Sequence, residues 1–293
     1  MADSSFTKWK SWRESPQFDP ESFLESLDGG QSFSWNRKES YLEGSFKGYL
    51  YRLKLEGDTL SVSIPQKLDY ENALSNLGEY FALETDFQGI IDTLPWRSDQ
   101  NLKRAIEAYP NLRILKQPLN EALFGFLCSS TKQIPQIKEM FRLTAQQYGP
   151  EVNMQVHALP NWDVIAQLEE TDLRKLKLGY RARYIHKTAQ KIKAEPDWLN
   201  SLHTMDTNEA KKELLSLPGV GSKIADCVLL FSLGRLESFP IDTWIAKILK
   251  RAYGLEGFSN DQLQAFSRNH YGPYAGYAQQ FLFSAARSGV LKL

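Results

Sequence analysis

The spacing of apolar residues changes near residue 110, and this change limits the folds open to the chain. Over residues 45–66 apolar and polar residues alternate, and Glu56-Gly57-Asp58 interrupts the alternation. A period of two that is broken by a turn predicts an antiparallel β-hairpin. A shorter strand is predicted at residues 31–35, after Gly29-Gly30. The first part of the chain is therefore predicted as an α+β domain built on an antiparallel sheet.

After residue 110 apolar residues recur at spacings of three and four, which is the period of an amphipathic helix. Short breaks that contain Gly, Pro or Asp separate the helical segments. We predict helices at residues 120–129, 134–148, 164–168, 182–192, 208–215, 222–233, 243–253 and 274–286. The chain is thus predicted to hold two domains, residues 1–112 and an all-α domain at residues 113–293.

The composition excludes several classes of protein. No apolar run approaches the roughly 20 residues that a membrane span needs, and the first residues lack the pattern of a secretory signal. We therefore expect an intracellular protein without membrane contact. Cys128 and Cys227 are the two cysteines. They are too few to ligate an iron–sulfur cluster and lack the close pairing of a zinc site, so we expect two buried thiols.

The net charge is zero, but it is unevenly distributed. Residues 1–100 hold 10 Lys and Arg against 17 Asp and Glu, a net charge of −7. The remaining residues hold 25 against 18, a net charge of +7. A basic second part can follow a phosphate backbone, although a charge of this size also fits an ordinary solvated surface.

The motif Leu217-Pro-Gly-Val-Gly221 separates two predicted helices. Pro218 ends the first helix, whereas Gly219 and Gly221 permit positive φ and leave backbone N–H groups uncovered. The second helix then begins with free N–H groups, which bind a phosphate without a cationic side chain. This pattern predicts a helix-hairpin-helix that holds a DNA backbone without reading its sequence. A simple turn between two helices fits these five residues equally well.

Lys223 opens the second of these helices, and Asp242 opens a later one. The positive end of the helix dipole and apolar neighbours such as Ile224 disfavour an ammonium at Lys223, and a neutral amine can attack a sugar C1′ to form a Schiff base. Asp242 is most simply an N-cap. A capping carboxylate is held rigidly, and we expect it to stay ionised and to stabilise the cationic sugar that forms when a glycosidic bond breaks.

The segment Leu217-Pro-Gly-Val-Gly-Ser-Lys-Ile-Ala-Asp-Cys227, followed by Pro240-Ile-Asp242, resembles the helix-hairpin-helix-Gly/Pro-Asp DNA glycosylases, and among them the eukaryotic-type 8-oxoguanine DNA glycosylases. Other blocks of that family match in order, and the resemblance spans about residues 24–287. These blocks are Gly30-Gln-Ser-Phe33-Ser-Trp35, Phe126-Leu-Cys-Ser-Ser130, Leu178-Gly-Tyr-Arg-Ala-Arg-Tyr184 and His270-Tyr-Gly-Pro-Tyr-Ala-Gly-Tyr-Ala-Gln279. The resemblance implies a twisted antiparallel β-sheet domain packed on a helix-hairpin-helix glycosylase domain, with the site in the cleft between them.

The resemblance also implies roles for single residues. Lys223 falls on the Schiff-base lysine and Asp242 on the catalytic acid. The carbonyl of Gly30 would accept the N7–H that 8-oxoguanine has and guanine lacks, so that guanine would bring two acceptors face to face. Gln279 would read the Watson–Crick edge of the base, and the remaining members of the pocket would be Phe283, Cys227 and Pro240, the first two enclosing the flipped ring. Without the resemblance, spacing alone assigns Phe283 and Cys227 to the core and Gly30 to a turn.

Residues expected to contact DNA include the hairpin glycines Gly219 and Gly221, together with Tyr180 and Arg181. The last two fall in the family's block that enters the base stack and contacts the base opposite the lesion. An arginine there can pair with an orphaned cytosine. Alternatively, Arg181 is a surface arginine at a basic helix start.

The chain departs from the family at the positions that face the opposite strand. Thr131-Lys132-Gln133 replaces an asparagine run, Gln136 replaces an arginine that holds the opposite cytosine, and Trp244 replaces a histidine that contacts a phosphate. Thr131, Lys132 and Trp244 remain candidate DNA contacts. We expect the demand for cytosine opposite the lesion to be relaxed.

These features together predict a bifunctional DNA glycosylase and β-lyase of base excision repair, which removes 8-oxoguanine from double-stranded DNA. We expect a monomer, in the cytoplasm if the source is bacterial and in the nucleus if it is eukaryotic. A glycosylase for alkylated bases and a non-catalytic helix-hairpin-helix DNA-binding protein are the alternatives. We expect no required cofactor, although carbonyls of the hairpin at 217–221 could hold a monovalent cation.

Overall fold

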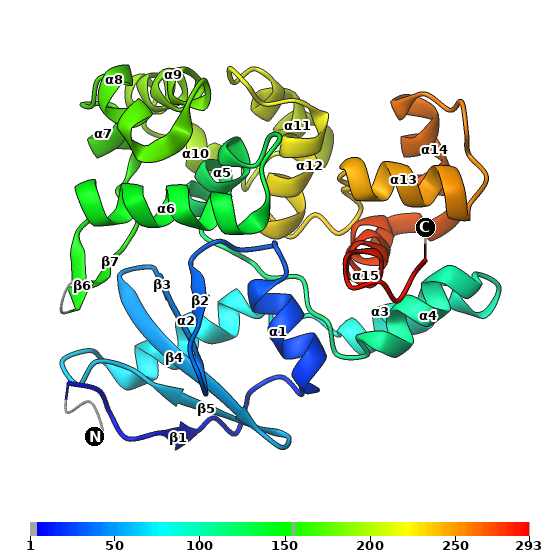
Figure 1. The fold of residues 1–293 in the computed structure, drawn as a ribbon, viewed down its shortest axis with the longest axis horizontal. Coiled ribbons are helices and arrows are strands. Elements are labelled where there is room, and N and C mark those ends of the chain that lie inside the picture. Colours follow the sequence, from blue (N-terminus) through cyan, green and yellow to red (C-terminus); the bar gives the residue numbers. More distant parts are fainter. Residues whose placement is uncertain (1–4, 154–155, 293) are drawn as a thin grey trace.

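The computed structural model describes residues 5–153 and 156–292. Within these residues a five-stranded antiparallel sheet is followed by a mostly helical part, as predicted (Figure 1). The strands lie in the order β1-β5-β4-β3-β2 across the sheet. They are β1 (Lys10–Ser11), β2 (Trp35–Arg37), β3 (Leu42–Phe46), β4 (Tyr49–Glu56) and β5 (Thr59–Ser63). A separate pair of strands is formed by β6 (Glu151–Asn153) and β7 (Val156–His157).

The helices before the hairpin motif are α1 (Pro20–Asp28), α2 (Tyr70–Tyr80), α3 (Phe87–Thr93), α4 (Gln100–Ala108), α5 (Leu119–Cys128), α6 (Ile134–Tyr148), α7 (Trp162–Ile165), α8 (Glu170–Leu173), α9 (Arg181–Ala194), α10 (Trp198–Ser201) and α11 (Thr207–Leu215). Those after it are α12 (Ser222–Phe231), α13 (Thr243–Ala252), α14 (Asn260–Tyr271) and α15 (Ala275–Arg287). The predicted helices agree with these bounds within two residues, except that α7 ends at Ile165 rather than at residue 168. No helix of the described residues is both long and apolar enough to cross a bilayer.

The predicted hairpin contains one more turn than expected. Phe46 is not continuous with β4 but ends β3, where it pairs with Tyr49. Lys47 and Gly48, which join the two strands, have φ of 48° and 77°, as a two-residue hairpin turn requires. The turn predicted after Glu56 is confirmed, because Glu56 pairs with Thr59.

The strand predicted at residues 31–35 begins only at Trp35. Gln31 explains the difference, because its side chain is committed to the segment between α4 and α5. Its amide donates to the Arg113 carbonyl at 2.7 Å and accepts from the Leu115 N–H at 3.0 Å. In return, Gln117 donates to the Gln31 carbonyl at 2.7 Å. These bonds hold the loop that carries Gly30 against the helical part.

Helices also occur before residue 110, where the sequence pattern predicted mainly strands. Each of α2, α3 and α4 begins at an aspartate, and these caps are Asp69, Asp86 and Asp99. Each carboxylate accepts backbone N–H groups of the first turn, which are otherwise unpaired. The three N-caps are visible in the sequence, but the hydrophobic period alone does not reveal the helices that they begin.

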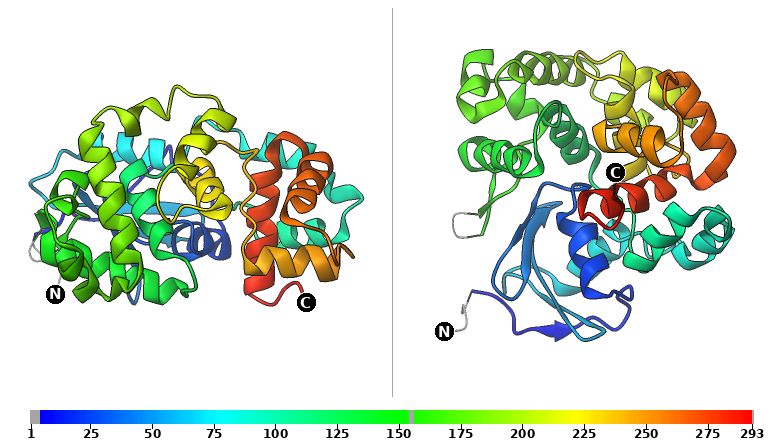
Figure 2. Two further views of the ribbon diagram at one scale, coloured as in Figure 1. Left: turned by 90° about the horizontal axis from the view of Figure 1, so that it is seen from above. Right: turned by 45° about the vertical axis from the view of Figure 1, so that its right-hand side comes forward.

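Two cores hold the chain together. The first lies between the sheet, α1 and α2, and is dominated by aromatic residues such as Trp35, Phe46 and Tyr80. The second is helical, and it includes α3 and α4 although both precede residue 112. Figure 2 shows α4 beside α15, and the two helices are in contact. The start of α4 is also joined to the end of α13, because the Tyr253 hydroxyl donates to Asp99 at 2.7 Å.

Candidate active site

A cavity of about 930 Å³ brings together residues that are far apart in the sequence. Its wall is formed by the loop after α1, the turn between α5 and α6, the start of α12, the start of α13 and the end of α15. The predicted site residues that line it are Gly30, Thr131, Lys132, Lys223, Asp242, Trp244 and Phe283. The cavity therefore joins both predicted catalytic residues to part of the predicted base pocket.

The hairpin at 217–221 has the predicted form, with one correction. Gly219 has a φ of 81°, and a Cβ there would lie 2.5 Å from the Tyr184 ring, so the turn requires glycine. Gly221, in contrast, has an extended backbone with φ of −97°. It precedes α12, whose N-terminus has no side-chain cap among the described residues. The exposed first N–H groups of α12 are therefore free to bind an anion.

Lys223 is half-buried at the start of α12. Its Nζ donates to the Ser129 Oγ at 3.0 Å and lies 5.4 Å from the centre of the Phe126 ring. The Ser129 hydroxyl donates its own proton to the Phe126 carbonyl at 2.7 Å. Because the hydroxyl proton is committed, Ser129 acts toward Lys223 as an acceptor, and it fixes the direction of the amine toward the cavity.

Asp242 is the N-cap of α13, as predicted. Its Oδ1 accepts the Ile245 N–H at 2.8 Å, which fixes the carboxylate at the cavity wall. Burial raises the pKa of Asp242 above its ordinary value, while the bond from Ile245 and the charge of Lys223 oppose that rise. Asp242 therefore needs a higher pH to ionise than an exposed aspartate does, and its ionisation at neutral pH stays a prediction.

The predicted base-binding residues fall into two groups. Gly30 and Phe283 line the cavity, and a Cβ on Gly30 would lie 2.7 Å from Ile134 and 4.0 Å from Phe283. Cys227, Pro240 and Gln279 are buried instead. Burial raises the pKa of the Cys227 thiol to about 12, and the adjacent Lys223 opposes the rise.

Gln279 carries an unusual polar atom. Its side chain is 4% exposed, and its Oε1 has no hydrogen-bond partner among the described residues. A buried amide oxygen without a partner costs free energy, so it marks a position where a donor is missing.

The predicted opposite-strand residues are placed differently from one another. Tyr180 is 49% exposed, whereas Arg181 is 3% exposed, so the alternative of a surface arginine is wrong. The Arg181 guanidinium donates to the Ser130 carbonyl, and to the Thr131 Oγ1 at 3.1 Å. Thr131 has a φ of 54°, which is uncommon for a residue other than glycine. Arg181 therefore holds the turn between α5 and α6 in this conformation.

Ser129 and Ile134 are among the residues of the site that the sequence pattern did not reveal. Ser129 lies in the quoted block after Cys128, but its partner Lys223 is 94 positions away, so no local pattern reveals the contact. Ile134 was assigned only to a helix, yet it packs against Gly30. In the part of the chain that the structure describes, no three His, Cys, Asp or Glu side chains converge to hold a metal ion.

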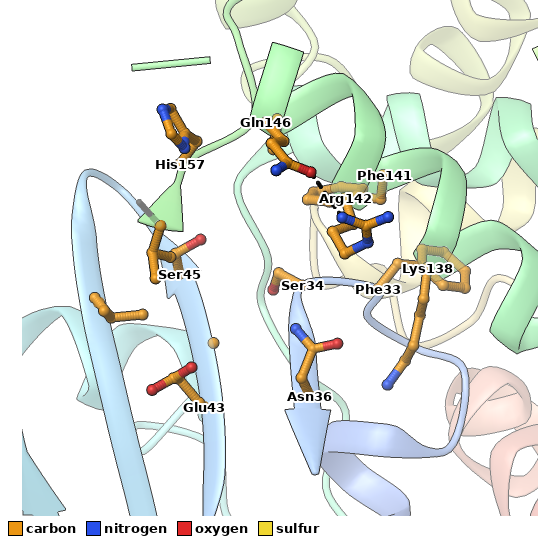
Figure 3. Close-up of a pocket in the computed structure, with 14 residues that line it drawn as sticks. Phe33, Ser34, Asn36, Glu43, Ser45, Lys138, Phe141, Arg142, Gln146 and His157 are labelled. Atoms are coloured by element: carbon orange, nitrogen blue, oxygen red, sulfur yellow. Dashed lines mark hydrogen bonds between the residues drawn. The ribbon is translucent and has the colours of Figure 1, made fainter. Parts of the chain in front are cut away.

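A smaller hollow of about 230 Å³ lies between β2, β3 and α6 (Figure 3). It holds several charged side chains, and three of them form hydrogen bonds with neighbouring groups. Glu43 accepts from Arg52 at 2.8 Å, Arg142 donates to Gln146 at 2.7 Å, and Lys138 donates to the Trp35 carbonyl at 2.6 Å. The first and third contacts join structural elements and the second lies within α6, so these side chains already have structural partners and the larger cavity is the better candidate for chemistry.

Two family models match the chain in succession. The model described as "8-oxoguanine DNA glycosylase, N-terminal domain" matches residues 16–123. The model described as "HhH-GPD superfamily base excision DNA repair protein" matches residues 126–270. Fold and site together thus define the helix-hairpin-helix class of base excision repair proteins.

Relatives narrow this class. "N-glycosylase/DNA lyase OGG1" of Arabidopsis thaliana is 33% identical over 234 residues, which are 74% of this chain and 60% of that protein. "Probable N-glycosylase/DNA lyase" of Methanothermobacter thermautotrophicus is 30% identical over 258 residues, covering 78% of this chain and 79% of the relative. Clostridium acetobutylicum 8-oxoguanine glycosylase/lyase, solved with dsDNA containing cytosine opposite to 8-oxoG, superposes with a TM-score of 0.85 at 27% identity, covering 98% of this chain and 100% of that one. The chain belongs to the 8-oxoguanine DNA glycosylase family.

Proposed function

We propose that this protein is a bifunctional DNA glycosylase and β-lyase that removes 8-oxoguanine from duplex DNA. The observation that carries the proposal is the position of Lys223 and Asp242. They come from two different helix starts and line one cavity, which also holds Gly30 and Phe283. The free N-terminus of α12 supplies a place for a DNA phosphate next to the nucleophile.

The proposed reaction uses both residues. After Lys223 gives up its ammonium proton to solvent, its Nζ attacks C1′ of the flipped nucleotide, and the C1′–N9 bond breaks with its electron pair going to the base. The Asp242 carboxylate stabilises the positive charge that develops on the sugar. The attached nitrogen then passes a proton to the expelled base. The sugar ring opens as the C1′–O4′ bond breaks with its electron pair going to O4′, which takes up a proton, and a C1′=N Schiff base remains. Removal of a C2′ proton expels the 3′ phosphate from C3′ with the bonding electrons, which breaks the strand.

Proposed base recognition draws on Gly30 and Phe283 at the cavity wall and on the buried Gln279. The Gly30 carbonyl would accept the N7–H of 8-oxoguanine, and Phe283 would stack on the ring. The unpartnered Oε1 of Gln279 supports this proposal, because a donor on the Watson–Crick edge of the base would satisfy it. A ligand that pairs this oxygen gains more than one that leaves it buried and unpaired.

Excision assays with borohydride test the proposal. We expect the protein to release 8-oxoguanine from a duplex and to form a covalent DNA complex when borohydride reduces the Schiff base. An undamaged duplex should give neither product. If the wild-type protein releases the base but forms no trapped complex, the lyase mechanism is wrong.

The two alternatives give different results in the same assays. A glycosylase for alkylated bases would excise 3-methyladenine in preference to 8-oxoguanine, and Lys223 would have no catalytic task in it. A non-catalytic DNA-binding protein would bind both duplexes and release no base. The contact between Lys223 and Ser129 favours the bifunctional enzyme, because it holds an amine at the cavity wall.

The enzyme is expected to accept 8-oxoguanine opposite any base. Gln136 cannot supply a guanidinium, and it is committed to the start of α6, where its Oε1 accepts the Gln133 N–H at 3.1 Å. Arg181 is buried against the turn at 130–131. A bidentate arginine–base pair is worth about 1–3 kcal/mol of discrimination, so without one the excision rates opposite the four bases should agree within about tenfold.

Single-turnover excision of 8-oxoguanine placed opposite C, A, G and T measures this prediction. The matched variant is Gln136→Arg, which restores a guanidinium at an exposed position and should increase the preference for cytosine. A wild-type rate opposite cytosine more than about a hundredfold above the others would contradict the prediction.

A further inference from the structure

Helix α13 continues from the cavity wall and carries a face that the proposed chemistry does not use. Thr243 and Trp244, in its first turn, line the cavity. At 3.6 residues per turn, Lys247 lies one turn after both of them, about 5 Å further along the axis. The opposite side of the helix is buried through Ile245 and Ile248. Lys247 therefore projects from the same side as the edge of the cavity.

The positive charges on α13 have no carboxylate partners among the described residues. The helix contains three basic residues, Lys247, Lys250 and Arg251, and no acidic residue between positions 243 and 252. In the described residues no carboxylate lies within ion-pair distance of any of the three, whereas Arg174 of the helical part pairs with Glu170. Lys250 and Arg251 lie in the last turn, where cations stabilise the helix dipole. Lys247 lies in the middle of the helix and has no such explanation.

Trp244 is a large apolar side chain that remains 38% exposed at the edge of the cavity. The Lys247 Nζ lies 5.8 Å from the centre of its ring, a distance at which an ammonium and an indole attract each other. An aromatic face beside an unpaired cation is the combination with which proteins bind nucleic-acid strands whose bases are unstacked. Base flipping creates such a strand at the edge of the cavity.

We propose that Trp244 and Lys247 form a binding site for the damaged strand beside the flipped nucleotide. The Trp244 ring packs against a sugar or base that flipping has uncovered, and the Lys247 ammonium pairs with the phosphate of that nucleotide. This inference rests on the proposed function. It assigns to α13 a contact that depends on side chains, unlike the backbone contact at the start of α12.

Binding measurements at several salt concentrations separate the phosphate contact of Lys247 from the packing contact of Trp244. The probe is a labelled 8-oxoguanine duplex, and the background is Lys223→Gln so that no reaction occurs. In that background, Lys247→Ala should weaken binding and reduce the slope of log K against log salt by about 0.9, the value for one phosphate contact. Lys247→Arg should keep the slope. Lys67→Ala, which removes an exposed cation in the first part of the chain, is the matched control and should leave both quantities unchanged.

Replacing Trp244 should change the affinity but not the salt dependence of binding. Trp244→Ala should weaken binding about tenfold while the salt slope stays constant, because an indole releases no counterion. Trp244→Phe should retain most of the affinity. Equal salt slopes for Lys247→Ala and its parent overturn the phosphate contact, and equal affinities for Trp244→Ala and its parent overturn the stacking contact.

Excision by the wild-type chain distinguishes a failure of the proposed strand site on α13 from a failure of the proposed function. If the wild-type chain excises 8-oxoguanine while both alanine variants bind as their parent does, this inference alone is wrong. If the wild-type chain releases no 8-oxoguanine, the proposed function is wrong, and the proposed strand site on α13 is then wrong as well.

Discussion

A Lys223→Gln variant is expected to form no borohydride-trapped complex and to excise 8-oxoguanine at least about 10⁴-fold more slowly than the wild type, a loss typical of removing a catalytic nucleophile. The physical reason is that attack on C1′ needs the lone pair of the lysine amine. Glutamine is nearly as long as lysine and can still donate to Ser129, but its amide nitrogen is delocalised and cannot attack C1′. The variant should therefore keep the geometry around Ser129 and lose the chemistry.

The measurement is single-turnover excision together with trapping, on an 8-oxoguanine duplex. Lys193→Gln, which removes an exposed lysine of α9, is a control for the change of charge. Affinity for the duplex should change little in Lys223→Gln, since the phosphate site at the start of α12 consists of backbone groups. A trapped complex that persists in Lys223→Gln would place the Schiff base on another amine and overturn the assignment.

The sequence predicted elements that depend on local pattern. The helices around the hairpin were placed within two residues, because each buries a continuous apolar stripe that the period of 3.6 records. Asp242 was recognised as an N-cap because the cap is a property of adjacent residues. Lys47-Gly48 was overlooked, although a lysine followed by glycine can take two positive φ values and reverse a strand.

The sequence could not predict contacts between distant segments. Periodicity shows that a residue is buried but not what it is buried against, so α3 and α4 gave no sign of joining the helical core. Arg181 illustrates the same limit. An arginine is usually found at the surface. Arg181 is buried instead, and its guanidinium donates to two oxygen atoms of the turn at 130–131. The roles of Gly30 and Gln279 came from family resemblance, because neither residue type implies a base pocket.

The second large effect concerns stability, and it comes from Glu121. This residue lies in the first turn of α5 and is 9% exposed. Burial raises the pKa of the Glu121 carboxyl to about 8, and a hydrogen bond from the Lys47 backbone N–H opposes the rise. The Lys47 ammonium does not neutralise the carboxyl, because it pairs with Glu79. The folded protein therefore keeps Glu121 protonated at a pH where the unfolded chain has ionised it.

This difference sets the sign of the pH dependence. Below the ordinary glutamate pKa of about 4.3, Glu121 is protonated in both the folded and the unfolded state, so its ionisation does not lower the free energy of unfolding. As the pH rises from there to about 8, unfolding releases a proton, so the free energy of unfolding falls by up to about 1.4 kcal/mol per pH unit. The total loss is on the order of 5 kcal/mol, and it levels off above the folded pKa.

Glu121→Gln should remove this part of the pH dependence, because glutamine stays neutral and its carbonyl can still accept the Lys47 N–H. At about pH 5 the variant and the wild type should have similar midpoints of urea unfolding, whereas at about pH 9 the variant should be several kcal/mol more stable. Glu107→Gln, at an exposed position of α4, measures the effect of losing one surface charge. A difference between Glu121→Gln and wild type that does not change with pH would mean that the folded protein ionises Glu121. In that case water reaches the start of α5, and the contact between this helix and the β3–β4 turn is looser than a 9% exposed side chain implies.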